Sequence, residues 1–269
     1  MGDPTEGGSD ESDQQLGSAA VSLEPPAAPV PVLDGPFNPT VDLLALHYDH
    51  ASARDDGLAA VAARELTDWA AVTPLVVGGA YEAGNERFIP ESADVMAAAW
   101  GDAWLDAHGD RDAAVAATAG RWLTTIDAGG TVWVAEGGPS DFTAAVVRWL
   151  QADRPDVDTS AVIGVVQHSE ANELRTTASD LAFVRANTTY VKIADGNHLN
   201  DTADFRRSSP AFVEAALAGA NGQVWEVAFA YLDPNVDLDF SDAVLVLHLF
   251  GIEVAEVATP DDFAEAFIN

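Results

Sequence analysis

The sequence predicts an α/β fold: a doubly wound, mostly parallel sheet with helices on both faces. Short apolar segments of strand length alternate with longer segments in which apolar residues recur at helical spacing. A polar loop separates each strand from the helix that follows, and regular alternation of this kind is typical of parallel sheets. The chain has 269 residues, of which 48% are hydrophobic, enough for one large domain with a substantial core.

The beginning of the chain differs in composition from the rest. Gly, Ser, Pro, Ala and acidic residues dominate residues 1–36, which contain no Lys or Arg. Such a segment offers too few large apolar side chains to offset the entropy lost on ordering. We therefore expect a disordered arm over residues 1–36 and the α/β domain over residues 37–269.

The first half of the domain predicts two strands and three helices. Residues 43–48 are apolar on both faces of a strand apart from the polar end, so we place this strand in the centre of the sheet. Residues 57–66 have helical periodicity, and residues 73–79 form a second apolar strand. Helical patterns follow over residues 92–108 and 112–125.

The second half continues the alternation and then becomes less regular. Residues 131–135 predict a third strand, and a helix over residues 141–151 begins just after Pro139, as helices tend to do. The remaining expected elements are strands at residues 161–166, 190–193 and 252–257, an apolar helix or strand at residues 243–250, and a closing helix opened by Asp261 and Asp262.

The charge of the chain limits its partners. There are 44 acidic and 12 basic residues, a formal net charge of −32, and Lys192 is the only lysine. Such a surface repels nucleic acids and anionic membranes, so we expect neither as a partner. The composition resembles that of proteins from high-salt cytoplasm. It also weakens any inference from an isolated Asp or Glu, because acids are the commonest surface residues here.

Several classes of site and location are excluded or disfavoured by composition. The chain has no cysteine, which excludes disulfides, thiolate nucleophiles, Cys-based zinc sites and iron–sulfur clusters. No apolar run approaches the roughly 20 residues that span a bilayer. Acids stand where a signal peptide carries basic residues, so we expect a cytoplasmic protein, with export through an upstream signal left open.

Three carboxylates surround the loop between the first strand and its helix. Asp49 follows the strand, and Asp55 and Asp56 open the helix. Ligands of parallel α/β sheets bind at the carboxyl ends of the strands. Three acids so close repel one another, and a hard cation such as Ca²⁺ would relieve the repulsion. Alternatively, Asp55 is an N-cap and Asp56 a first-turn acid, both solvated. The stretch leaves both interpretations open.

A second group of candidates follows the fourth predicted strand. His168, Asn172 and Glu173 lie in a polar loop at the same end of the sheet, where substrate contact is expected. A histidine in a polar loop is also commonly structural or exposed. We therefore carry all three as candidate substrate-binding residues.

Four segments occur in a characteristic order. They are Asp49 with Asp55-Asp56 at a helix start, Ala83-Gly84-Asn85 after the second strand, Gly138-Pro139 between a strand and a helix, and Ser241-Asp242 before an apolar helix. In this order and spacing, residues 43–250 resemble the nucleoside hydrolase superfamily.

This resemblance implies a function and a ligand set. The family binds Ca²⁺, and the matching ligands here are Asp49, Asp56, Asp242 and the main-chain carbonyl of Asp141. Asp49 would also act as the catalytic base. Asp55 and Asn85 would bind sugar hydroxyls. The expected activity is Ca²⁺-dependent hydrolysis of N-glycosidic bonds in nucleosides or related ribosyl compounds, with a small nucleoside or sugar-like ligand. Association of identical chains is left open.

The chain departs from the family pattern at three places. Ala51 stands where the family has a second acid, which ligates calcium and activates water. Asp141-Phe142 replaces a Thr-Asn pair, and Ser241 stands where a His is common. These departures favour an alternative: a catalytically silent relative that binds a sugar-like ligand, a metal or a protein partner.

Overall fold

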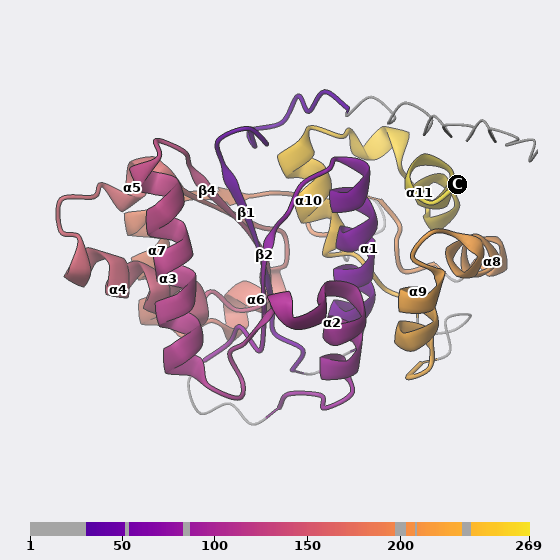
Figure 1. Cartoon of the computed structure of the whole chain (residues 1–269), viewed down its shortest axis with the longest axis horizontal. Coiled ribbons are helices and arrows are strands. Elements are labelled where there is room, and N and C mark those ends of the chain that lie inside the picture. The colour runs from indigo at the N-terminus through magenta and orange to yellow at the C-terminus, as the bar shows by residue number, and fades with distance from the viewer. Residues whose placement is uncertain (1–30, 52–53, 83–86, 197–202, 208, 233–237) are drawn as a thin grey trace, which may run out of the picture.

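The computed structural model describes residues 31–51, 54–82, 87–196, 203–207, 209–232 and 238–269. In these segments a single parallel sheet lies between two groups of helices, so the expected doubly wound α/β fold is confirmed (Figure 1). None of the helices in the described segments is long and apolar enough to cross a bilayer.

The sheet has the first strand at its centre. The strands are β1 (Leu43–Tyr48), β2 (Leu75–Gly78), β3 (Leu105–Asp106), β4 (Val132–Gly137), β5 (Ile163–Gln167) and β6 (Thr189–Lys192). Their order is β3-β2-β1-β4-β5-β6, and every pair is parallel. The order reverses direction at β1 and β4, so loops after these strands border the crevice where such sheets bind ligands.

Each face of the sheet has its own hydrophobic core, because successive strand residues point to opposite sides. Leu44 and Leu46 of β1 belong to one core, whereas Ala45 packs with Val134 in the other. The first core lies under α1 (Asp55–Trp69), α2 (Ser92–Trp100), α8 (Pro210–Ala218), α9 (Gly222–Phe229), α10 (Ala243–Phe250) and α11 (Pro260–Phe267). The second lies under α3 (Arg111–Asp127), α4 (Asp141–Asp153), α5 (Thr159–Val162) and α7 (Ala178–Asn187).

Two predicted elements differ from the structure. The helix expected over residues 92–108 ends at Trp100, because Gly101 adopts a φ of 60° that a helix cannot continue. A 3₁₀ turn (Gly101–Ala103) and β3 follow it. The strand expected over residues 252–257 is instead a 3₁₀ turn (Val254–Glu256). The Ile252 N–H donates to the Leu247 carbonyl (2.9 Å), so Ile252 is still part of the turn that ends α10.

The helices α5, α6 (Glu170–Arg175), α7, α8 and α9 were not among the predicted elements, and α5 includes residues 161–162, which were expected to begin a strand. The apolar segment at residues 243–250, which the sequence predicts as either a helix or a strand, is the helix α10. The other predicted strands and helices are present, with bounds that shift by a few residues.

The junction between the predicted arm and the domain packs against α10, from Leu33 in the arm to Phe37 at the start of the domain. The Phe37 N–H donates to the Leu249 carbonyl (3.2 Å), and the Phe37 ring lies 5.8 Å from that of Phe250. Leu33 packs against the same core, and a Cβ on Gly35 would lie 2.2 Å from the Leu249 oxygen. The last residues of the arm thus run close along α10. Residues 1–30 lie outside the described segments.

Candidate functional site

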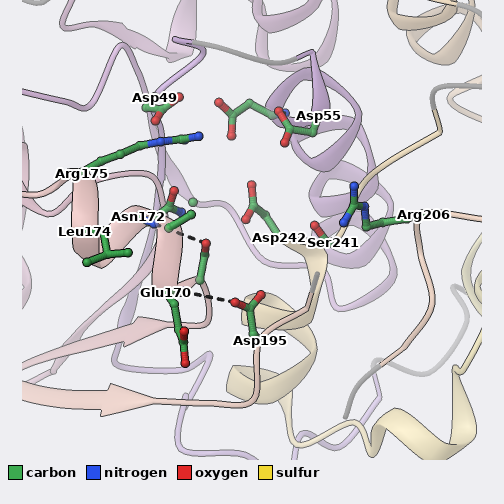
Figure 2. Close-up of a pocket in the computed structure, with 14 residues that line it drawn as sticks. Asp49, Asp55, Glu170, Asn172, Leu174, Arg175, Asp195, Arg206, Ser241 and Asp242 are labelled. Carbon is green, nitrogen blue, oxygen red and sulfur yellow. Dashed lines mark hydrogen bonds between the residues drawn. The ribbon is translucent and has the colours of Figure 1, made fainter. Parts of the chain in front are cut away.

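A pocket of about 390 Å³ lies at the carboxyl ends of the central strands (Figure 2). Its walls come from the end of β4, the loops after β1, β5 and β6, the starts of α1 and α10, α6, and the segment that carries Arg206. Six acids and two arginines line it: Asp49, Asp55, Asp56, Glu170, Asp195, Asp242, Arg175 and Arg206. The pocket therefore has an excess of negative charge in a partly enclosed space.

The loop between β1 and α1 folds around its own carboxylates. His50 takes a left-handed backbone conformation, with φ at 52°, and its N–H donates to Asp56 at 2.5 Å. The Ala51 N–H donates to Asp49 at 2.8 Å. The N-cap position of α1 is held by Arg54, whose side chain makes no capping bond. The capping interpretation of Asp55 therefore does not describe this loop.

Burial and mutual repulsion perturb the acids of this loop. Burial raises the pKa of Asp56 well above its usual value, and the charges of Asp49, Asp55 and Asp242 raise it further. Burial, followed by the charges of Asp242 and Asp239, raises the pKa of Asp55 to about 7. The pKa of Asp49 is also raised by burial, although a hydrogen bond with Asp56 opposes this. Burial and the neighbouring acids thus disfavour the charged forms of these carboxylates.

Asp242 is brought to the pocket by the start of α10 and held there by His168. The His168 Nε2 is hydrogen-bonded to the Asp242 carboxylate, and the Gly196 N–H points at Nδ1 from 3.0 Å. Lys192, the only lysine of the chain, donates to the His168 carbonyl at 2.6 Å. Burial lowers the pKa of His168, but hydrogen bonds with Asp195 and Asp242 outweigh burial and raise it to about 9. Nε2 donates to Asp242 in both protonation states.

Two glycines allow the end of β4 to approach these acids. A Cβ on Gly138 would lie 2.7 Å from the Cβ of Asp49. A Cβ on Gly137 would lie 2.9 Å from Tyr48 Cδ1 and 3.2 Å from an oxygen of Asp242. Only glycine permits this separation without a shift of the backbone. The turn after β4 therefore lets β1 and α10 bring their carboxylates together.

The structure brings together most of the residues predicted to form the site. Asp49, Asp55, Asp56, Asn172 and Asp242 all line the pocket. His168, in contrast, is fully buried behind Asp242 and does not line it. Asn85 lies outside the described residues.

Glu173 and Asp141 lie away from the pocket lining and have other partners. Glu173 accepts hydrogen bonds from Tyr190 (2.8 Å) and Arg185 (2.7 Å). The Asp141 carbonyl accepts from the Arg111 guanidinium at 3.1 Å, and its carboxylate accepts from the Thr177 N–H at 3.1 Å. In this structure both acids hold neighbouring elements together.

Four charged residues of the pocket were missed: Glu170, Arg175, Asp195 and Arg206. Glu170 and Asp195 follow β5 and β6, and the Glu170 N–H donates to Asp195 at 3.2 Å (Figure 2). Their positions after parallel strands were a usable signal. Arg175 ends α6, a helix of only six residues that the pattern did not predict, so no local signal pointed to it.

The donor chemistry of the pocket fits a hard cation. Asp49, Asp56 and Asp242 supply charged oxygens, which Ca²⁺ prefers, and their repulsion is what a cation relieves. Within the described residues, no three His, Asp or Glu side chains already converge as a metal-binding group. Binding would therefore require side-chain rotation. The Asp141 carbonyl, which Arg111 already contacts, is not part of the pocket lining.

Comparisons of the chain with models of protein families, with curated proteins and with solved structures find no match.

Proposed function

We propose that the protein is a Ca²⁺-dependent hydrolase of N-glycosidic bonds in nucleosides or related ribosyl compounds. The observation that supports this proposal is the meeting of Asp49, Asp56 and Asp242 in one pocket at the carboxyl ends of parallel strands. These acids come from opposite ends of the domain, so their proximity is not a local accident of an acidic sequence. The resemblance to nucleoside hydrolases in the same segments supports the same reaction.

Asp49, Asp56 and Asp242 would hold the cation. A bound Ca²⁺ would orient sugar hydroxyls and lower the pKa of a coordinated water. Asp49 accepts a proton from the attacking water, the role of a general base. Asp55 and Asn172 hydrogen-bond the sugar hydroxyls and fix the ring in the pocket. The carboxylates around the ring stabilise the positive charge that develops on the sugar as the base departs.

The alternative is a catalytically silent protein that binds a sugar-like ligand, a metal or a protein partner. Ala51 favours it, because this buried residue supplies no oxygen where the family pattern has a second acid. The contact of Arg111 with the Asp141 carbonyl favours it as well, since a ligand of the family pattern is already occupied. In this case the pocket binds its ligand but catalyses no reaction.

Calorimetric titration with Ca²⁺ tests the metal site. We expect Asp56→Asn and Asp242→Asn each to weaken binding at least about tenfold, because each removes a charged ligand that water replaces poorly. The matched control is Asp102→Asn, which changes the net charge equally at an exposed acid outside the pocket. Equal affinity in all four proteins would rule out the proposed ligands.

Release of free base from a mixed panel of nucleosides, followed by chromatography, tests the reaction. The proposed function expects turnover that is lost on chelation of the metal and in Asp49→Asn. Calcium binding without turnover on any nucleoside would favour the silent alternative. Ala51→Asp then restores the acid of the family pattern, and a gain of turnover in this variant would identify the missing group.

A further inference from the structure

Arg175 reaches into the acidic pocket from the last turn of α6. Figure 2 shows its side chain extending across the pocket toward Asp49. Other arginines of the chain pair with acids outside the pocket, as Arg148 does with Asp180 (2.6 Å) and Arg154 with Asp127 (2.9 Å). In a chain with 12 basic and 44 acidic residues, a cationic side chain directed at this cluster calls for a physical role.

The second arginine of the pocket is placed differently. Arg206 forms an ion pair with Asp239 at 2.9 Å, so part of its charge is balanced beside the cluster. Arg175 instead acts on the cluster itself. Its side chain is directed toward Asp49, and both residues line the same pocket (Figure 2). The positive charge of the guanidinium therefore stabilises the negative charge of the pocket.

Recognition of an anionic substrate group is the obvious alternative role for Arg175. Six carboxylates line the pocket against two arginines, so an anion there would be repelled more strongly than it is attracted. The same surplus attracts cations. The charge of the pocket therefore favours a role for Arg175 toward the acids over a role toward an anionic ligand.

We propose that Arg175 is the intrinsic counter-ion of the pocket, and that a divalent cation competes with it for Asp49 and the neighbouring carboxylates. The cation would be Ca²⁺, and in that respect the inference rests on the proposed function. Arg175 lies in the exposed part of α6 beside Leu174, whose side chain is 87% exposed. Its long side chain can therefore swing into solvent when a cation takes its place. Arg175 thereby weakens cation binding.

Calcium affinity of charge variants tests the competition. We expect Arg175→Gln to bind Ca²⁺ about tenfold more tightly than the parent in calorimetric titration, because the competing charge is gone. Arg175→Lys keeps the positive charge, so its calcium affinity should stay close to that of the parent. Arg148→Gln changes the net charge equally outside the pocket and should leave the affinity within about twofold. Equal or weaker binding by Arg175→Gln would overturn the proposal.

A thermodynamic cycle without metal tests the counter-ion role separately. In chelator, Arg175→Gln should lower the thermal midpoint of the parent, and this loss should largely vanish in an Asp49→Asn background. An equal loss in both backgrounds would overturn the counter-ion role. A parent that binds no Ca²⁺ but shows this coupling overturns the proposed calcium site and supports Arg175 as counter-ion. If the parent and Arg175→Gln bind Ca²⁺ equally tightly and the cycle shows no coupling between Arg175 and Asp49, this inference is overturned while the proposed calcium site stands.

Discussion

At the scale of single residues, the pocket depends on groups that stand behind its carboxylates. His168 is the clearest case: it is fully buried, contacts Asp242 through Nε2 and meets the Gly196 N–H at Nδ1. Without it, the Asp242 carboxylate would lose the partner that Nε2 supplies. A Cβ on Gly196 would lie 3.0 Å from His168 Nδ1, so glycine is what lets the backbone come this close.

Replacing His168 should therefore cost stability in a way that depends on hydrogen bonding. We expect His168→Leu to lower the free energy of unfolding by about 1–3 kcal/mol, the range for an unsatisfied buried polar group. His168→Gln offers both a donor and an acceptor and should lose less. Urea unfolding of the two variants measures the difference. Equal losses would show that His168 acts by filling space.

Gly138 is a second residue whose replacement is informative. The methyl group of Gly138→Ala would lie 2.7 Å from the Asp49 Cβ, so the loop after β1 must shift. We expect a loss of about 1–3 kcal/mol in the free energy of unfolding. Gly120→Ala is the control: Gly120 lies on the exposed side of α3 with nothing within 4 Å of the new Cβ, and should gain up to about 1 kcal/mol. A neutral Gly138→Ala in denaturant unfolding would contradict this close approach.

At the scale of elements, α1 is the helix that connects the pocket to the core. It begins with the pocket acids Asp55 and Asp56 and continues between the sheet and the outer helices, buried along most of its length. Glu65 lies on this buried helix and accepts hydrogen bonds from Trp225 (2.9 Å) and Asn221 (2.8 Å) of the α9 region. One carboxylate thus joins α1 to α9.

This buried acid predicts a pH-dependent stability. Burial raises the pKa of Glu65, despite the hydrogen bonds from Asn221 and Trp225. The folded protein therefore holds the proton more tightly than the unfolded chain, and this contribution to stability is lost as pH rises from about 4 through the folded pKa. In Glu65→Gln the contribution is absent, so the unfolding free energy of the variant minus that of the parent should rise over this interval.

Urea unfolding at several pH values between 4.5 and 7.5 measures this difference. Glu226→Gln on α9 is the matched control, because Glu226 is exposed and lies next to Trp225 in sequence. A difference for Glu65→Gln that stays constant with pH would contradict the direction of the shift. A constant offset is expected in addition, because glutamine replaces one acceptor by a donor.

At the scale of the whole molecule, the residues around the predicted start of the domain at residue 37 pack against α10. Phe37 is 2% exposed, and Gly35 lies against the end of α10. We expect a chain that starts at residue 31 to keep the thermal midpoint of the full chain. A chain that starts at residue 38 should lose about 2–4 kcal/mol of the free energy of unfolding, because this truncation removes the buried ring of Phe37. Calorimetric melting at fixed salt compares them, and a lower midpoint for the first truncation would contradict the expectation.

The same comparison of scales shows what the sequence determined. The period and length of the apolar segments were enough to predict the parallel α/β fold. They also predicted that β1 is central, because a strand that is apolar on both faces must be covered on both. The spacing of Asp49, Asp55 and Asp56 placed them in one loop, since local geometry follows local sequence. Gly101 was an available stop signal for α2 that the helical pattern alone overlooked.

Tertiary structure decided the rest. Glu173 follows the same strand as His168, yet contacts with Tyr190 and Arg185 turn it away from the pocket. His168 meets Asp242 across 74 positions, and Arg175 enters the same pocket from a six-residue helix. Such contacts depend on how distant elements pack, and the direction of a polar side chain is set by the partner it finds there. Local sequence specifies which residues reach the end of a strand, whereas packing specifies which of them face the pocket.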